Sequence, residues 1–413
     1  MLRPDNPRPA VSPVLLTALF VVTLGGRFAM ASSQTGVVLG LDLRAGLCVA
    51  LLLAALTWWM VADQPVPLVL RPVAGVLLLL AYLLLGGFWA DPAARLSQVG
   101  LDLAMLVVLV LVTAIVVAAD PSRALYWFFL LSVVAAVVFA VAAWLTGPGG
   151  QGRYAAFGGG PNVFVRIQCL GVIAAVALAI RGHQLWYLAP VPLLLYSAFL
   201  SGSRGGLAAL IVAAAVAVVL GRGLRFAHAL GMLLLAGILA VVAYVFGNSA
   251  MTELYSRYSF SGLQSSDFSV RPELLRRAWR IMQESPWFGA GMDGFFAHSG
   301  RFLGIDYPHN MVAEIGADGG LVGLLLLVGA VGWLLRSTVR GGRWASWDRG
   351  GCLVAGAYLA TAGMFSGTFY DARLLWIYLT MLGALATRPA APPAATTRTA
   401  TAAPPATAAL GTD

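Results

Sequence analysis

Three predicted helix starts carry the side chains best suited to chemistry in this sequence. In chain order they are Pro161-Asn162 with Arg166, Ser203-Arg204, and Pro308-His309-Asn310. An apolar stretch long enough to cross a bilayer follows each of them. Because charge beside hydrocarbon is costly, such groups usually mark a ligand or a pathway. The pattern predicts that an anionic, lipid-linked substrate is handled at the outer surface of a membrane.

His309 is the best candidate for moving a proton. Pro308 restricts the backbone before it, and an apolar stretch begins directly behind it. An imidazole has an ordinary pKa near ~6.5, and nearby arginines disfavour its protonation. A neutral imidazole can accept a proton from an attacking hydroxyl. The alternative is an interfacial histidine that only caps the helix. His298 shares the outer segment, whereas His183 and His228 fall on the inner side.

Arg204 lies in the run Ser201-Gly-Ser-Arg-Gly-Gly, at a predicted helix start. We expect the glycines to let a ligand approach the backbone, and the first-turn N–H groups add partial positive charge. With Ser203, this predicts a phosphate site. Arg166 lies four residues after Asn162, so both occupy one helix face. The alternative for either arginine is a side chain that reaches the lipid headgroups.

Residues 248–310 form the one long connection in the sequence, and it gathers aromatic and cationic side chains. Long polar insertions on a scaffold often carry function. We predict that Arg271, Arg276 and Tyr255 from this segment contact the substrate. For Arg276 a solvated cationic helix face is the alternative. The acidic residues of the segment are not clustered, which favours a mechanism without a divalent metal; no cofactor is predicted.

The composition is that of a membrane protein. Hydrophobic residues make up 60% of the 413 and charged residues only 10%, against about 25% in soluble domains. All 26 basic residues are arginine, whose guanidinium can bind two phosphate oxygens at once. The net charge of +9 is spread over many short loops, so nucleic acid is not an expected partner. The three cysteines have no metal-ligand spacing.

The predicted fold is an all-α polytopic integral membrane protein with about twelve transmembrane helices, compatible with a GT-C-like architecture. The apolar runs are 14–31, 44–62, 73–90, 98–119, 123–146, 161–180, 184–200, 204–220, 226–247, 311–335, 350–369 and 372–387. Thirteen arginines then fall on the side of the N-terminus and six on the other. By the positive-inside rule both termini are cytoplasmic.

This topology divides the chain into five segments. They are a cytoplasmic N-terminal segment (1–13), transmembrane helices one to nine (14–247), a large periplasmic loop with short helices (248–310), helices ten to twelve (311–388) and a disordered cytoplasmic tail (389–413). The tail is rich in Ala, Thr and Pro and cannot build a core. The active site is expected to face the periplasm.

Four motifs in order resemble the bacterial O-antigen ligase and polymerase superfamily. They span roughly residues 155–325. The motifs are Phe157-Gly-Gly-Gly-Pro-Asn162, Ser203-Arg204-Gly205, Arg271 followed by Pro286 and Gly289-Ala-Gly291, and His309-Asn310 followed after nine residues by Gly320-x-x-Gly323. The last is similar to the ligase signature. Residues before this region carry no motif of the family.

The resemblance implies a metal-independent, inverting glycosyl transfer at the periplasmic face of the bacterial inner membrane. The implied donor is O-antigen on undecaprenyl pyrophosphate, and the implied acceptor is a sugar hydroxyl of lipid A–core. By similarity, His309 is the general base, and Arg204 with Arg271 binds the pyrophosphate. An O-antigen polymerase or another oligosaccharyltransferase on the same carrier stays open. A lipid-linked glycan transporter is the alternative from another class, although no internal repeat supports it.

Overall fold

The computed structural model is helical apart from one short hairpin, within the residues that it describes. These are 12–25, 37–38, 41–61, 70–220, 267–340 and 347–387. The hairpin pairs β1 (Val37–Val38) antiparallel with β2 (Leu41–Asp42). The helical fold class is confirmed. Tyr255, His228, the predicted span 226–247 and the predicted tail lie outside the described residues.

The helices follow the predicted apolar runs closely. They are α1 (Pro13–Gly25), α2 (Leu43–Val61), α3 (Leu70–Leu85), α4 (Leu96–Ala119), α5 (Pro121–Thr146), α6 (Pro161–Gly182), α7 (Val191–Leu200), α8 (Arg204–Leu220), α12 (Asp267–Glu284), α13 (Arg301–Leu303), α14 (Met311–Arg340), α15 (Trp347–Phe365) and α16 (Arg373–Thr387). Pro121 and Pro161 stand in the first turns of α5 and α6, where a missing N–H costs nothing.

Five of the described helices are long and apolar enough to cross a membrane. They are α2, α4, α5, α6 and most of α14, and five further apolar helices are shorter. The chain therefore has the character of a membrane protein, while the count of twelve spans stays a prediction. The expected span 184–200 is broken into a 3₁₀ turn at Leu185–Leu188 and the ten-residue α7. Pro190 and Pro192 lie at this break, because proline cannot donate the hydrogen bonds of a continuous helix.

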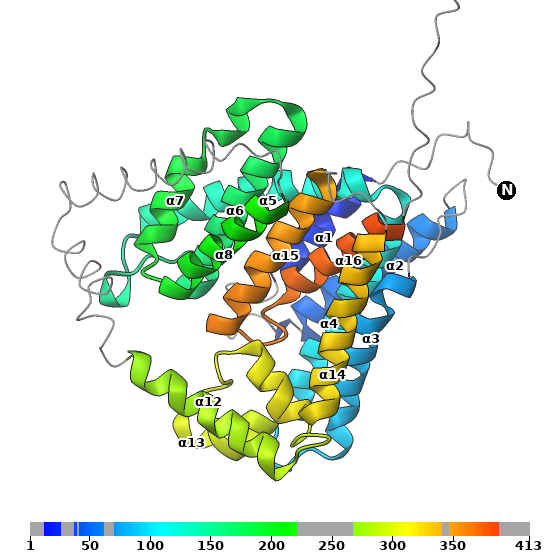
Figure 1. The fold of residues 1–413 in the computed structure, drawn as a ribbon, viewed down its shortest axis with the longest axis vertical. Helices are drawn as coiled ribbons and strands as arrows, with labels where there is room; N and C mark the ends of the chain where they lie inside the picture. Colours follow the sequence, from blue (N-terminus) through cyan, green and yellow to red (C-terminus); the bar gives the residue numbers. More distant parts are fainter. Residues whose placement is uncertain are drawn as a thin grey trace, which may run out of the picture.

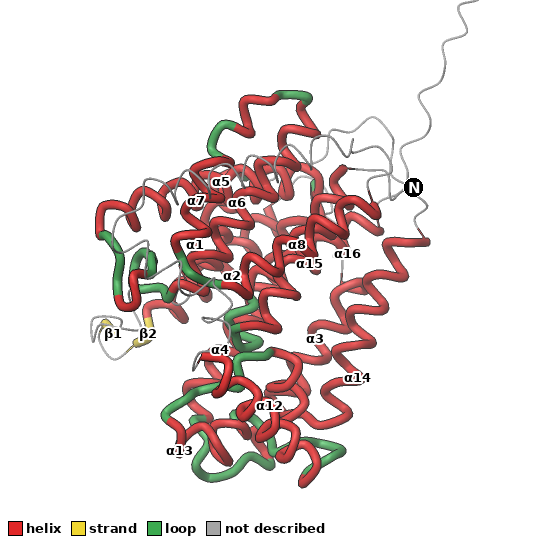
Figure 2. The backbone as a smooth tube through the Cα atoms, turned by 60° about the vertical axis from the view of Figure 1, so that its left-hand side comes forward, coloured by secondary structure: helices red, strands yellow, loops and turns green. Residues whose placement is uncertain are grey.

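The helices pack as one bundle with an appended segment at one end. α5 packs on α6, α15 on α8 and α16, and α3 on α14. Figure 1 shows α12 and α13 below the rest, where α12 lies against the start of α14. Figure 2 shows that the loops cluster mainly around this same end. Residues 267–310 thus form a compact helical part of the predicted 248–310 loop.

α16 occupies the core of the bundle. Trp376 and Tyr378 are fully buried, together with Tyr358 of α15. At the start of α16 the buried Arg373 donates from Nε to the carbonyl of Thr23 at 3.0 Å and lies over the Tyr370 ring. Because α16 is held from several sides, the turn that joins α15 to α16 has a fixed position.

Candidate functional site

The three predicted helix starts meet at the turn between α15 and α16. We use the name α15–α16 turn for residues 364–372, which are the last two residues of α15 and the loop that follows them, and this segment contains several small and polar residues. The starts of α6 and α14 each donate a side-chain hydrogen bond to it, and the start of α8 packs against Phe365. Residues far apart in sequence therefore converge on one short segment.

Asn162 joins α6 to two of the other elements. Its Nδ2 donates to Ser366 Oγ at 3.1 Å, and its Oδ1 accepts from Ser203 Oγ at 2.9 Å. Arg166, one turn further along α6, donates from Nη2 to the carbonyl of Ala362 at 3.3 Å. A Cβ built on Gly367 would lie 2.8 Å from that same nitrogen. The guanidinium of Arg166 therefore packs directly on the turn.

Arg204 begins α8, as the sequence predicts. Ser203 before it is buried, and its backbone N–H donates to Ser201 Oγ. The expectation that the following glycines let a ligand approach the backbone stays a prediction, and the structure gives these glycines a packing role. Cβ atoms built on Gly205 and Gly206 would lie 2.5 Å from Phe365 and 2.3 Å from Val165. These positions require glycine because α8 packs closely on α15 and α6.

His309 lies in a turn whose backbone is strained. Its φ is +56°, a left-handed conformation that is uncommon outside glycine and recurs at functional sites. The imidazole ring stands edge-on to Tyr307, with centroids 4.6 Å apart. Its Nδ1 is buried and has no hydrogen-bond partner in the part of the chain that the structure describes. Such a group costs free energy, so its retention favours a functional role.

Two charged residues act on His309 from different elements. Burial and the guanidinium of Arg271 in α12 lower the pKa of His309 below its ordinary value, and the carboxylate of Asp371 opposes them. The folded protein therefore favours the neutral imidazole, which is the form that can accept a proton. Sequence reasoning paired Arg271 with His309 but did not place Asp371 beside them.

Asn310 fixes the other end of this turn. Its Oδ1 accepts from the backbone N–H groups of Val312 and Ala313, so it caps the first turn of α14. Its Nδ2 donates to the carbonyl of Met364 at 3.1 Å. Asn310 thus holds the chain directly after His309 against the α15–α16 turn.

The glycines of the predicted motifs have a packing role. Gly289 and Gly320 both have positive φ, and a Cβ on Gly289 would lie 2.5 Å from the backbone nitrogen of Gly320. Gly291 donates its N–H to the carbonyl of Asp318 at 3.0 Å. The segment after α12 is thereby locked onto a kink in α14, which helps to set α12 and its Arg271 relative to His309.

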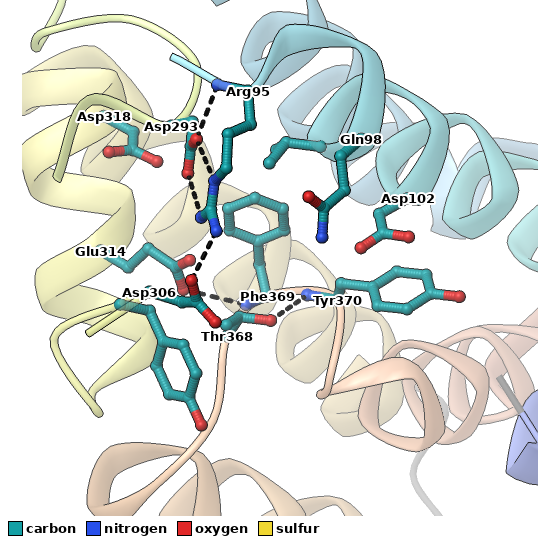
Figure 3. A pocket seen from close by; sticks show the side chains of 12 residues that line it. Arg95, Gln98, Asp102, Asp293, Asp306, Glu314, Asp318, Thr368, Phe369 and Tyr370 are labelled. Carbon is teal, nitrogen blue, oxygen red and sulfur yellow. Dashed lines mark hydrogen bonds and ion pairs between the residues drawn. The ribbon is translucent and has the colours of Figure 1, made fainter. Parts of the chain in front are cut away.

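Sequence reasoning missed the α15–α16 turn and the residues that support it. Glu314 is buried and accepts from the backbone N–H of Phe369 at 3.1 Å, as Figure 3 shows. A signal was present, since Ser366-Gly-Thr and Asp371 interrupt an otherwise apolar stretch. Their partners could not be known before the helices were placed in space.

Two predicted contacts are not brought to this turn. Arg276 is exposed and pairs with Glu273 on its own helix at 3.2 Å, as the alternative of a solvated face predicts. Tyr255 lies outside the described residues. Among the histidines, His298 and His183 are exposed. Within the described ranges, no group of three His, Cys, Asp or Glu side chains could hold a metal ion.

Two comparisons with known proteins support one family. A family model described as O-antigen ligase matches residues 189–328, a range that contains Arg204, Arg271 and His309. The chain is also 27% identical over 363 residues to an O-antigen ligase of Pseudomonas aeruginosa (strain PAO1), and the match covers 81% of this chain and 84% of that protein. These two matches confirm the resemblance to the O-antigen ligase family, and the family model matches residues 189–328 of this chain.

Proposed function

We propose that this protein ligates O-antigen during lipopolysaccharide biosynthesis, at the periplasmic face of the inner membrane. The donor is O-antigen linked to undecaprenyl pyrophosphate, and the acceptor is a sugar hydroxyl of lipid A–core. The observation that carries the proposal is the position of His309. It interacts electrostatically with Arg271 and Asp371, and Asn310 directly after it binds the α15–α16 turn, which the starts of α6 and α8 also contact.

The reaction is an inverting displacement. His309 takes the proton from the acceptor hydroxyl as its oxygen attacks the anomeric carbon of the donor sugar. The bond between that carbon and the pyrophosphate oxygen breaks, and the electron pair leaves with undecaprenyl pyrophosphate. Arg204 and Arg271 bind the pyrophosphate and stabilise the charge that develops on it. Two guanidinium groups can supply the neutralisation that other transferases take from a divalent cation, so the mechanism needs no metal.

Binding and positioning involve further residues of the converged site. Arg166 packs on the α15–α16 turn and supplies another cation near the donor. Asn162, Ser203 and Asn310 hold the helix starts in register, because each of them forms a side-chain hydrogen bond between elements. Rigid support of this kind is required because a displacement of about 1 Å can cost roughly 100-fold in rate.

The test is transfer by the purified protein in the presence of EDTA, with lipid-linked O-antigen and lipid A–core as substrates. We expect His309→Ala to lower the rate by about 10²- to 10⁴-fold, the usual contribution of a general base. His298→Ala is the matched control, since this histidine is exposed in the same segment, and it should retain activity.

Near-normal transfer by His309→Ala would contradict the assignment of the base. Gene deletion separates the other functions by their products. Core without O-antigen, with carrier-linked polymer accumulating, supports a ligase, whereas core capped by one repeat identifies a polymerase. A protein that moves lipid-linked glycan but forms no glycosidic bond would be a transporter.

A further inference from the structure

Arg95 connects the start of α4 to the segment that leads into His309. It lies directly before α4, as the N-cap residue of that helix, and its backbone N–H donates to Asp293 Oδ2 at 2.9 Å.

 Its guanidinium forms a two-point ion pair with the Asp293 carboxylate, from Nε at 2.9 Å and from Nη2 at 3.0 Å. The third nitrogen, Nη1, donates to Asp306 Oδ1 at 2.5 Å. Figure 3 shows the guanidinium between these two carboxylates. Arg95 therefore ties together two points of the chain that are thirteen residues apart.

Arg95 also contacts the stretch between Asp293 and Asp306. The guanidinium carbon lies 3.6 Å from the centre of the Phe296 ring, at the start of the π-helical turn Phe296–Gly300. Within the stretch, the N–H of Ile305 donates to the carbonyl of Gly300 at 3.1 Å. The segment is thus a folded unit, and Arg95 is the side chain that fastens both of its ends to α4.

The first of these ends is strained and is held in place. Asp293 has a φ of +60° and is 7% exposed, so a residue with a buried carboxylate adopts the left-handed backbone conformation that is uncommon outside glycine. The neighbouring Phe295 donates its N–H to Asp318 of α14 at 2.9 Å. The first end of the segment is therefore attached to α4 and to α14 together.

The second end leads directly into the candidate base. Asp306 is three residues before His309, and between them Pro308 is buried while the Tyr307 ring contacts the imidazole. On the far side of His309, Asn310 is fixed to α14 and to Met364. The turn that carries the imidazole thus has one anchor at Asn310 and a second anchor at the Asp306–Arg95 ion pair.

We propose that Arg95 is a positioning residue for glycosyl transfer, holding the turn 306–309 so that the His309 imidazole meets the acceptor hydroxyl. The inference rests on the proposed function of His309. A bidentate guanidinium suits this role because it fixes the directions of its partners, which the point charge of a lysine does not. Arg95 acts on the geometry of the base and takes no part in binding the pyrophosphate.

The test compares Arg95→Ala, Arg95→Lys and Asp306→Asn in the reconstituted transfer assay. We expect kcat to fall by about 100-fold in Arg95→Ala, while KM for the lipid-linked donor stays within about twofold. Arg95→Lys should recover part of the loss. Asp306→Asn should also lower kcat. The double variant Arg95→Ala with Asp306→Asn should be no slower than Arg95→Ala alone, because both changes remove the same anchor.

Asp306→Asn is the variant that should still fold if Arg95→Ala does not. Asp306 is 62% exposed, so the substitution leaves no buried charge without a partner. Arg301→Ala is the matched control, since Arg301 is an exposed arginine in the same segment that contacts Phe302, and it should retain kcat. As a readout apart from activity, diethyl pyrocarbonate should modify His309 several-fold faster in Asp306→Asn, relative to His183 in the same sample.

Two results would overturn the inference, and they are separable from a failure of the proposed function. The first is an inactive His309→Ala together with Arg95→Ala and Asp306→Asn variants that keep kcat within about threefold of the wild type. The second is an unchanged rate of His309 modification in Asp306→Asn. An active His309→Ala would instead overturn the proposed function, and the role of Arg95 with it.

Discussion

At the scale of single residues, the site is a set of charged groups that act on the imidazole of His309. Arg271 and burial lower the pKa of His309, and Asp371 raises it. Arg204 begins α8 next to Ser203, whose hydroxyl is bonded to Asn162. These residues come from α6, the start of α8, α12, the turn before α14 and the α15–α16 turn. Their individual roles can be separated by substitutions that change one charge or one geometry at a time.

Replacing Arg204 with lysine keeps the charge but removes the fork of parallel N–H donors. If Arg204 binds the pyrophosphate through that fork, the loss corresponds to one charge-assisted hydrogen bond, about 1.5–3 kcal/mol. We expect kcat/KM for the lipid-linked donor to fall by roughly 10- to 100-fold. Full activity of Arg204→Lys in the reconstituted assay would show that this arginine only anchors α8 at the headgroups.

The pH dependence of kcat should report the charges around His309. A general base works only when neutral, so the rate falls as the pH drops through the pKa of His309 in the enzyme–substrate complex. Asp371 is the group that raises this pKa. Replacing it with asparagine should therefore move the acidic limb to lower pH. An acidic limb that stays in place, or that moves to higher pH, would contradict the electrostatic role of Asp371.

At the scale of elements, close backbone packing sets the distance between the outer segment and α14. Gly289 meets the kink of α14 at Gly320. α12, which carries Arg271, ends just before this contact, and α14 begins just after His309. The motif glycines thus act on the site through the placement of helices, and their substitution should lower stability before it changes chemistry.

Gly289→Ala tests this packing. A Cβ at this position would lie 2.4 Å from the backbone carbon of Asp318, which cannot move aside like a flexible side chain. We expect a loss of about 1–3 kcal/mol from overpacking, in addition to the cost of the positive φ, measured as a lower melting temperature in detergent. Gly304→Ala is the matched control, because its φ is +65° but no atom lies within 4 Å of the added Cβ. Equal losses for the two variants would refute the packing argument.

At the scale of the whole molecule, the bundle must present the converged helix starts on one side of the membrane. α14 runs from Met311, beside the site, to Arg340. Its part after the kink at Gly320, residues 321–340, is about 30 Å long at 1.5 Å per residue, which matches the thickness of a hydrocarbon core. The two ends of α14 should therefore face opposite compartments, with the arginine-rich end in the cytoplasm.

Labelling of introduced cysteines can test this orientation. We expect a membrane-impermeant maleimide to label Gln283→Cys in intact spheroplasts, and Arg336→Cys only after permeabilisation, since both positions are exposed. The three native cysteines are buried, so their background labelling should be low. Labelling of Arg336→Cys alone in intact spheroplasts would reverse the topology and place the candidate site in the cytoplasm.

Much of the helical framework was predictable from the sequence, because apolar length and proline position are local properties. The starts of α6 and α8 were predicted at Pro161 and Arg204, and both begin there. The sequence did not predict the break before α7, because the apolar run 184–200 continues through Pro190 and Pro192. The candidate residues around His309 were named in advance by type and motif, but the packing role of Gly205 and Gly206 depends on neighbours from α15 and α6.

The sequence by itself determined the helical membrane character of this protein, the positions of its helix starts and the family that its motifs resemble. Only the tertiary structure decided that Asp371 acts on His309, that the α15–α16 turn joins α6 and α14, and that Arg95 holds Asp293 and Asp306. The physical reason is the sequence separation over which each interaction acts. Hydropathy and helix capping depend on residues within a few positions of each other, whereas ion pairs and helix packing join residues about 200 positions apart, such as Arg95 and Asp293.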